Sequence, residues 1–230
     1  MEKELRLSPR LKKIAAFVPP AARLWDVGCD HAKLPVYLLQ QKRINFAVAS
    51  DIHAGPLESA KKTAEKYFLS NRMSFILCDG LPSENIYGAD CVVIAGMGGE
   101  TIRDILSSAV WTCAPGVTLL LQPMTAAAEL RRFLFDSNYN ILGEHYVSES
   151  HAKSKKHYLI IRAAGGGARE DYTETELRIG KPQHQSDDPS GYIAAELLRL
   201  EKEIAGAEIA GDAAQLKTLT EIKKGAQDRL

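Results

Sequence analysis

The sequence contains, at Arg23-Leu24-Trp25-Asp26-Val27-Gly28, a short apolar run closed by glycine, which is typical of a buried β-strand. Similar runs recur along the chain and alternate with amphipathic stretches of helical length. Strands that are apolar throughout are expected where helices cover both faces of a parallel sheet. The sequence therefore predicts an α/β fold with a doubly wound sheet. Strands are expected at 23–28, 46–51, 74–79, 91–96 and 117–122, and helices at 35–41, 56–69, near 102–106 and at 126–135.

Two further strand-like runs, at residues 139–146 and 157–162, have no segment of helical length between them. We interpret them as a terminal antiparallel hairpin, which brings the sheet to seven strands. At the other end of the domain, Ser8-Pro9 starts a helix that Pro19-Pro20 ends, because proline favours the first turn of a helix and breaks its interior.

The α/β domain is expected to end near residue 163, because the stretch that follows is polar and rich in glycine and proline. Beyond it, apolar residues recur every three or four positions on both sides of Gly211-Asp212, which predicts two antiparallel helices joined by a turn; one bent helix is the alternative. We therefore expect an α/β domain at 1–163, a linker at 164–191, and a C-terminal helical hairpin, a small coiled coil, at 192–230.

The composition is that of an ordinary globular protein of 230 residues, with 45% hydrophobic and 25% charged residues. No apolar run is long enough to span a membrane and the first residues are charged, so a cytoplasmic protein without membrane contact is expected. The four cysteines include no C-x-x-C pair, which favours buried thiols over a metal site. Basic and acidic residues both number 29, but residues 1–163 hold 20 basic and 16 acidic ones. This small surplus favours a polyanionic partner for the α/β domain.

The loops after the first four strands carry the candidate functional residues, because ligands of an open α/β sheet bind beyond the carboxyl ends of its strands. Acids follow three of these strands, and neither a dinucleotide motif nor a P-loop follows the first. Carboxylates repel phosphate, so a neutral or cationic ligand such as S-adenosylmethionine, with its ammonium and sulfonium groups, suits this edge. The four loops are Asp26-Val27-Gly28-Cys29-Asp30-His31, Ser50-Asp51, Cys78-Asp79-Gly80-Leu81-Pro82 and Ala95-Gly96-Met97-Gly98-Gly99.

Three residues of these loops can be given roles. Gly28 lets the backbone pass close to a ligand because it has no Cβ. Asp51 stands where a carboxylate accepts hydrogen bonds from ribose hydroxyls, and Asp79 where it meets an adenine amino group. Any one of these acids alone could equally cap a helix or stabilise a loop. Together, on one sheet edge, they indicate a ligand site.

Several motifs together resemble those of the bacterial tRNA (adenine-22-N1)-methyltransferases, the TrmK family of class I methyltransferases, whose fold is Rossmann-like. The resemblance runs from about residue 5 to 163, and the C-terminal helices are similar to the coiled-coil appendage of that family. Cys29, where Ser or Thr is more common, and Met124, where Asn is common, depart from the pattern. The motifs are Leu7-Ser8-Pro9-Arg10-Leu11, residues 26–35, Cys78-Asp79-Gly80-Leu81, residues 94–99 and Leu121-Gln122-Pro123.

The resemblance implies transfer of a methyl group from S-adenosylmethionine to N1 of adenine 22 in tRNA. It implies Asp30 as the catalytic acid, which would stabilise the positive charge that methylation leaves on the base. The cofactor-binding residues implied are Arg10, Asp26, Gly28, Asp30, His31, Asp51, Ile52, Asp79, Gly80, Ala95, Gly96, Met97 and Gly98. The substrate-binding residues implied are His31, Gly98, Gly99, Lys12, Lys13, Lys153 and Lys155.

The chemistry of adenine agrees with this assignment. N1 keeps its lone pair at neutral pH, so its methylation requires positioning more than a strong base. N1 also lies on the Watson–Crick edge, so a paired or stacked target must first be extruded. The N/D-P-P-Y/F motif of many enzymes that methylate exocyclic amines is absent after the fourth strand, which favours a ring nitrogen over N6 by analogy.

Nine basic residues are candidates for contact with tRNA phosphates. Only some of them are expected to make such contacts, because lysine and arginine are also ordinary residues of a solvated surface. A monomer or weak homodimer is expected. Two other functions stay open: a methyltransferase that uses the same cofactor on another RNA or a small molecule, and a noncatalytic module that binds through the Rossmann-like sheet. The candidate phosphate contacts are Lys12, Lys13, Lys42, Arg43, Lys61, Lys62, Lys153, Lys155 and Lys156.

Overall fold

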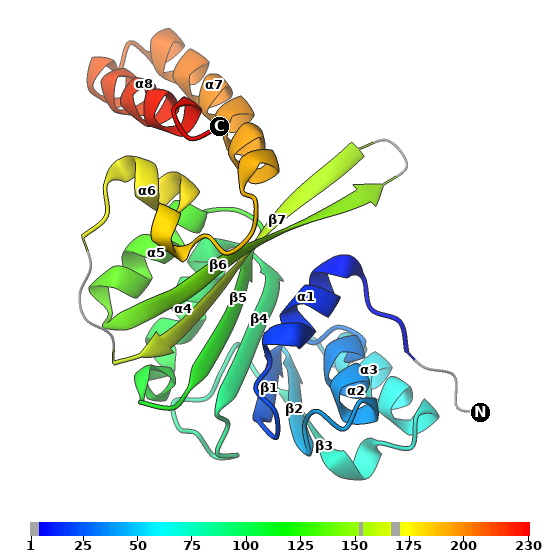
Figure 1. The fold of residues 1–230 in the computed structure, drawn as a ribbon. Coiled ribbons are helices and arrows are strands. Elements are labelled where there is room, and N and C mark those ends of the chain that lie inside the picture. Colours follow the sequence, from blue (N-terminus) through cyan, green and yellow to red (C-terminus); the bar gives the residue numbers. More distant parts are fainter. Residues whose placement is uncertain (1–4, 152–153, 167–170) are drawn as a thin grey trace.

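A seven-stranded sheet forms the centre of the computed structural model, which describes residues 5–151, 154–166 and 171–230 (Figure 1). The strand order is β3-β2-β1-β4-β5-β7-β6, and the neighbouring pairs up to β5 are parallel. This is the Rossmann-like, doubly wound sheet that the sequence predicts. The strands are β1 (Arg23–Val27), β2 (Phe46–Asp51), β3 (Met73–Leu77), β4 (Cys91–Met97), β5 (Thr118–Pro123), β6 (Tyr139–His151) and β7 (Ser154–Gly165).

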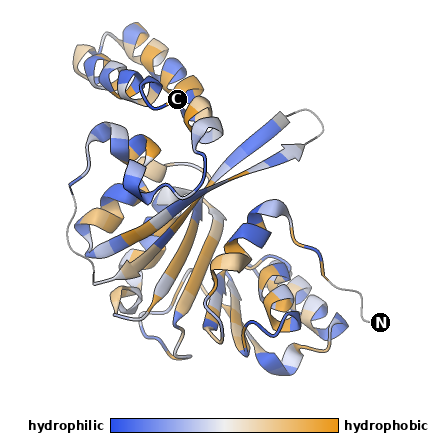
Figure 2. Cartoon of the chain, viewed as in Figure 1, coloured by the Kyte–Doolittle hydropathy of each residue, from blue (hydrophilic) through white to orange (hydrophobic). Residues whose placement is uncertain are grey.

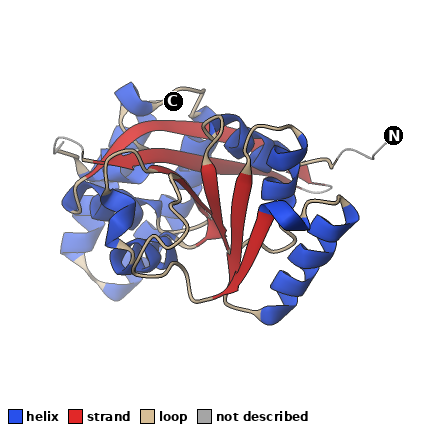
Figure 3. Ribbon diagram, turned by 90° about the horizontal axis from the view of Figure 1, so that it is seen from below, coloured by secondary structure: helices blue, strands red, loops and turns tan. Residues whose placement is uncertain are grey.

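Helices cover both faces of the sheet, and successive strand residues alternate between the faces (Figure 3). In β1, Leu24 packs in one hydrophobic cluster with residues of α1, α2 and α3, whereas Trp25 packs in a second cluster with residues of α4 and α5. Cys91 and Val92 of β4 divide in the same way. Burial on both faces explains why these strands are apolar throughout. The helices are α1 (Pro9–Phe17), α2 (Lys33–Gln40), α3 (Ala54–Lys66), α4 (Gly99–Ser108) and α5 (Ala127–Asp136).

The terminal hairpin is longer than predicted. β6 and β7 pair from Tyr139 opposite Gly165 to His151 opposite Ser154, whereas the sequence predicts strands at 139–146 and 157–162. The outer part of the hairpin is hydrophilic (Figure 2), so it carries no apolar signal. β7, the last strand in the chain, lies between β5 and β6 and is antiparallel to both.

The predicted helices form, with ends that shift by a few residues. α1 begins as expected, with the Ser8 side chain as its N-cap and proline in its first turn. α2 starts two residues earlier than predicted. α3 ends at Lys66 rather than at 69, because Phe68 adopts a left-handed backbone (φ 57°) and Leu69 N donates to Ala64 O at 2.9 Å.

The segment predicted as a linker, residues 164–191, is partly folded against the α/β domain. It contains α6 (Glu174–Ile179) and the 3-10 turn η3 (Pro182–His184). Leu177 and Ile179 of α6 are buried. A plain connector is therefore too simple a description of this segment, and the domain boundaries stay a prediction.

A buried ion pair joins α6 to the sheet. Arg131 of α5 donates to Glu144 of β6 through Nε (2.6 Å) and Nη2 (3.2 Å), and both side chains are at most 1% exposed. Its Nη1 atom donates to the carbonyls of Leu177 (2.7 Å) and Arg178 (3.1 Å). The guanidinium thus satisfies the last turn of α6, whose carbonyls have no partner within the helix. Glu144 also accepts the Tyr146 hydroxyl at 3.0 Å.

Two antiparallel helices follow, as predicted (Figure 1). Gly211 takes the left-handed conformation that ends the first (φ 70°), and Asp212 caps the second. The chain then returns to the domain, where Arg229 donates to Gly180 O at 2.5 Å. Supercoiling of the pair as a coiled coil stays a prediction. The helices are α7 (Ser190–Ala210) and α8 (Ala213–Gln227).

We expect Arg131→Met to lower the free energy of unfolding by about 3–5 kcal/mol, because it leaves the Glu144 carboxylate buried without its partner. Adding Glu144→Leu should recover most of this loss, since neither charge is then buried. The adjacent pair Arg132–Glu174, with side chains about half exposed, provides the control: Arg132→Met should cost less than about 1 kcal/mol. Urea unfolding followed by circular dichroism measures all three, and equal losses for the two single variants would contradict the argument.

Candidate active site

Backbone hydrogen bonds tie together the loops at the carboxyl ends of the strands. Cys29 N donates to Ser50 O at 3.0 Å, which joins the loops after β1 and β2. Met124 N donates to Met97 O at 2.8 Å, which joins the loops after β4 and β5. Residues predicted from separate loops therefore share one edge of the sheet.

The loop between β1 and α2 contains three residues with left-handed backbone: Gly28 (φ 66°), Asp30 (φ 50°) and Ala32 (φ 50°). They turn the chain tightly, and Ala32 N donates to Cys29 O at 2.7 Å. A Cβ at Gly28 would collide with the terminal methyl of Met97. The positive φ therefore favours glycine here, and the Met97 side chain fills the space beside it.

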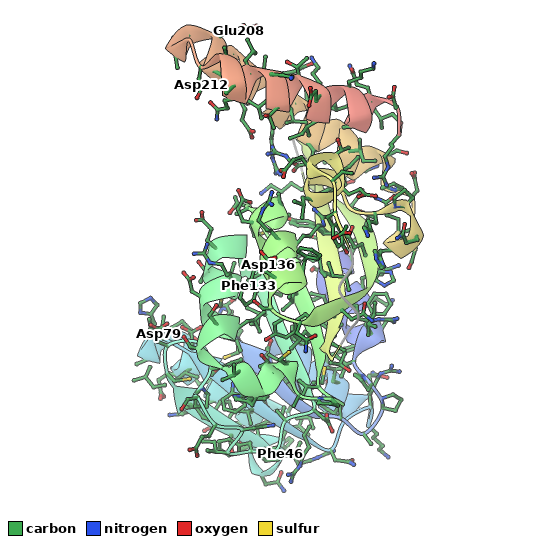
Figure 4. The ribbon with its side chains drawn as sticks, turned by 90° about the vertical axis from the view of Figure 1, so that its left-hand side faces the viewer. Phe46, Asp79, Phe133, Asp136, Glu208 and Asp212 are labelled. Atoms are coloured by element: carbon green, nitrogen blue, oxygen red, sulfur yellow. The ribbon has the colours of Figure 1, made fainter. Side chains whose placement is uncertain are left out.

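The four predicted acids differ in exposure. Asp26 is 6% exposed, and burial raises its pKa to about 7. Asp51 is partly buried and accepts a hydrogen bond from a backbone amide two residues further on at 2.9 Å. Asp79 is exposed at the margin of the molecule (Figure 4). Asp30 is also exposed, with its carboxylate 3.5 Å from His31 Nε2. The structure thus gathers these acids at one edge and desolvates Asp26 most strongly.

Apolar surface is available near Asp79. Ile52 is 54% exposed, and Leu77, the last residue of β3, is 61% exposed. Exposed apolar side chains beside polar groups provide a surface that a flat ring can cover. Leu77 is not among the residues predicted from the sequence, although it precedes Asp79 by only two positions. Gly80 has φ 69°, and a Cβ there would lie 2.7 Å from Ile105 Cγ1, so this loop packs closely on α4.

Arg10 links α1 to the end of β5. Its Nη1 donates to Oε1 of the buried Gln122, and its guanidinium lies 5.3 Å from the centre of the Tyr158 ring. Gly96 has φ 84°, and a Cβ there would be 3.4 Å from Arg10 Nη1. The Arg10 backbone amide donates to Glu149 Oε1 at 2.6 Å. Among these partners, Gln122 has a sequence signal, as a polar residue that ends an apolar strand.

The loop after β4 is packed tightly against the loop after β5. A Cβ at Gly99 would collide with the carbonyl of Ala126, and one at Gly98 would be 3.2 Å from Thr125 Oγ1. Gly99 N donates to Thr125 O at 2.8 Å. Close packing alone therefore explains why glycine occupies these two positions, without any contact to a substrate. Ala95, in β4, is partly buried.

The predicted phosphate-contacting lysines are dispersed. Lys12 is exposed on α1, and Lys155 is exposed on β7. Lys13 is instead paired with Asp187, with Nζ 2.7 Å from Oδ1. It therefore ties α1 to the segment before α7, and its role as a phosphate contact stays a prediction. Lys153 lies outside the described residues.

Within the described ranges, no group of three or more His, Cys, Asp or Glu side chains is arranged to hold a metal ion. None of the helices in the part of the chain that the structure describes has the length and apolarity of a membrane span. The four cysteines are free thiols, and burial raises the pKa of Cys29 and of Cys91. Both thiols are therefore protonated at neutral pH.

The fold and the site define a methyltransferase, and residues 7–161 match the family described as "Methyltransferase domain". The tRNA (adenine(22)-N(1))-methyltransferase of Bacillus subtilis (strain 168) is 34% identical over 177 residues, which are 77% of this chain and 73% of that protein. The crystal structure of the B. subtilis m1A22 tRNA methyltransferase TrmK has a TM-score of 0.79 at 27% identity, and the structure of M. capricolum TrmK in complex with the natural cofactor product S-adenosyl-homocysteine has 0.80 at 26%. Each of these two comparisons covers 97% of this chain and 99% of the other. The chain therefore belongs to the tRNA (adenine(22)-N(1))-methyltransferase family.

Asp26 should make the stability of the protein depend on pH. Its pKa is about 7 in the folded protein and about 3.9 in the unfolded chain, so the folded protein binds the proton more tightly. The resulting stabilisation is fully present below about pH 4 and is lost as the pH rises through about 7. Asp26→Asn lacks this titration, so between those limits the wild type should lose up to about 4 kcal/mol relative to the variant. Urea unfolding at intervals across the range tests this; parallel stability curves would exclude a titrating, buried Asp26.

Proposed function

We propose that this protein transfers a methyl group from S-adenosylmethionine to N1 of adenine 22 in tRNA. The observation that carries the proposal is the single sheet edge on which the glycine-containing loop after β1, the acids and the loop after β4 meet. The name of the Bacillus subtilis relative states this activity, and the M. capricolum neighbour holds the product of that cofactor.

The residues of the edge fit this cofactor, which when bound supplies a methyl group on a positively charged sulfur. Gly28 and Gly96 have positive φ and no Cβ, which suits loops whose backbone passes close to a ligand. Asp51 uses Oδ1 in a turn and has Oδ2 available for a ribose hydroxyl. Asp79 and the exposed Ile52 are suited to the amino group and the face of adenine. S-adenosylmethionine contains no phosphate that these carboxylates would repel, and their negative charge favours its cationic groups.

Asp30 is the acid that we assign to catalysis. Its side chain is exposed and its backbone is held in the left-handed conformation by the tight loop after β1. Adenine N1 needs no deprotonation, so this carboxylate acts by stabilising the positive charge that develops on the base and by accepting a hydrogen bond from the N6 amino group. We assign a contact with the same base to His31, whose Nε2 lies 3.5 Å from the Asp30 carboxylate.

The substrate contacts follow from the location of this edge. The target adenine must leave its stack to reach Asp30, so the RNA backbone approaches the loops closely. Lys12 and Lys155 are exposed and contact phosphates, whereas Lys13 is held by Asp187. We further infer that the enzyme acts in the cytoplasm, where its substrate is found, as a monomer or weak homodimer.

Incubation of the protein with labelled S-adenosylmethionine and unmodified tRNA should label adenine 22, and mass spectrometry of nuclease digests should place the methyl group on N1. A tRNA in which position 22 is changed to another base serves as the control and should stay unlabelled. A label on N6, on another nucleotide or on a protein would overturn the assignment, and cofactor binding without transfer would favour a noncatalytic module.

Asp30→Asn is the sharpest test of the catalytic assignment. Asn keeps the shape of the side chain and tolerates a φ of 50°, but it carries no charge. We expect methyl transfer to fall by about 100-fold or more, while cofactor affinity stays within about tenfold of the wild type. Asp30→Gly, which relaxes the backbone instead, should be as slow. Single-turnover rates and calorimetric titration with the cofactor give the two quantities, and an Asn variant as fast as the wild type would refute the role.

A further inference from the structure

A cavity of about 620 Å³ lies next to the candidate active site. Its walls are the loop from β5 into α5, the first residues of β7 in the outer part of the hairpin, and residues of α6 and α7. α7 begins beside the hairpin (Figure 1), where the His157 ring packs against Gly191. The cavity reaches the loops at the carboxyl ends of the strands through Met124 and Thr125, which are hydrogen-bonded to Met97 and Gly99. It is therefore continuous with the loops that we assign to the target base.

The walls of the cavity combine an apolar floor with a cationic side. The buried Tyr158 and Tyr192 line it, together with Met124, which is 40% exposed. Lys155 and Lys156, both exposed, stand on the hairpin side. An apolar floor with a few polar groups at its rim, in a volume of this size, is typical of a site for a small organic group.

Apart from Glu129, the other charged side chains of the lining pair with one another. On the α7 side, Arg178 Nε donates to Glu196 Oε2 at 2.7 Å, and its Nη2 atom donates to Glu203 Oε1 at 2.7 Å. Arg199 donates to the same Glu196. These pairs fix the α7 wall and leave its charges balanced. The net attraction for an anion therefore comes from the lysines of the hairpin.

We propose that this cavity binds the nucleotide next to the methylated adenine, with its base on the apolar floor and its phosphate at Lys155 and Lys156. The proposal rests on the function proposed above. A target base that leaves its stack draws the adjoining backbone toward the sheet edge, and the cavity is the neighbouring space that fits one nucleotide. Sequence-specific recognition of RNA depends on such splayed-out bases. α7 thereby becomes a wall of the substrate site, contributed by the C-terminal helices.

Ala195 and Ala194 of α7 provide a matched test. Ala195 lines the cavity and is partly exposed, whereas Ala194 is exposed and lies outside the lining. Ala195→Trp should fill the cavity and lower kcat/KM for tRNA by about tenfold or more, with cofactor affinity within about twofold of the wild type. Ala194→Trp should stay within about twofold in both. Equal kcat/KM for the two variants would overturn the proposal.

A charge reversal at the same position separates the loss of a nucleotide contact from a damaged helix. Ala195→Glu should weaken tRNA binding by about fivefold or more, because it opposes the phosphate, while Ala195→Lys should bind at least as tightly as the wild type. Equal losses for the two would point to a structural defect and would also overturn the proposal. A wild type that fails to methylate adenine 22 refutes the proposed function itself, whereas normal methylation with insensitive Ala195 variants refutes the nucleotide site alone.

Discussion

The buried pair of Arg131 and Glu144 fixes how α6 packs against the sheet, and the walls of the cavity beside α7 depend on it. One guanidinium satisfies both the carboxylate of β6 and the last carbonyls of α6. From Glu144 the contacts continue through Tyr146 to Gln185, and from there to Arg229 at the end of the chain. Buried charges are tolerated only with such complete pairing. The same network therefore holds α6, the turn before α7 and the end of the chain against the sheet.

The loops after β1, β4 and β5 are held differently, by close packing of side-chain and backbone atoms around glycines. Met97 lies over Gly28, and the carbonyl of Ala126 lies against Gly99. Contacts of this kind leave the backbone of these loops little freedom, so the candidate site residues start from fixed backbone positions. Arg10 completes the arrangement by joining α1 to Gln122. The far tip of the helical pair, marked by Glu208 and Asp212 in Figure 4, lies well away from this region.

Much of this could be predicted from the sequence, because the central strands are buried on both faces and the candidate site residues follow their carboxyl ends. Asp26, Asp51 and Asp79 follow directly from that pattern. The outer hairpin could not be predicted, since its side chains are polar and its pairing is set by β6 and β7 together. The roles of Lys13 and Gln122 depend on partners 174 and 112 positions away in the chain, and no local pattern carries such contacts.

The position of β7 between β5 and β6 has a consequence for synthesis of the protein. As the chain leaves the ribosome, β5 and β6 are both complete before the strand that separates them exists. Until residue 165 has emerged, each has an edge of unpaired amides and carbonyls, and such edges recruit strands from other chains. A truncated chain that ends before β7 lacks the strand that joins β5 to β6. Such a chain is expected to aggregate or to be degraded by proteases.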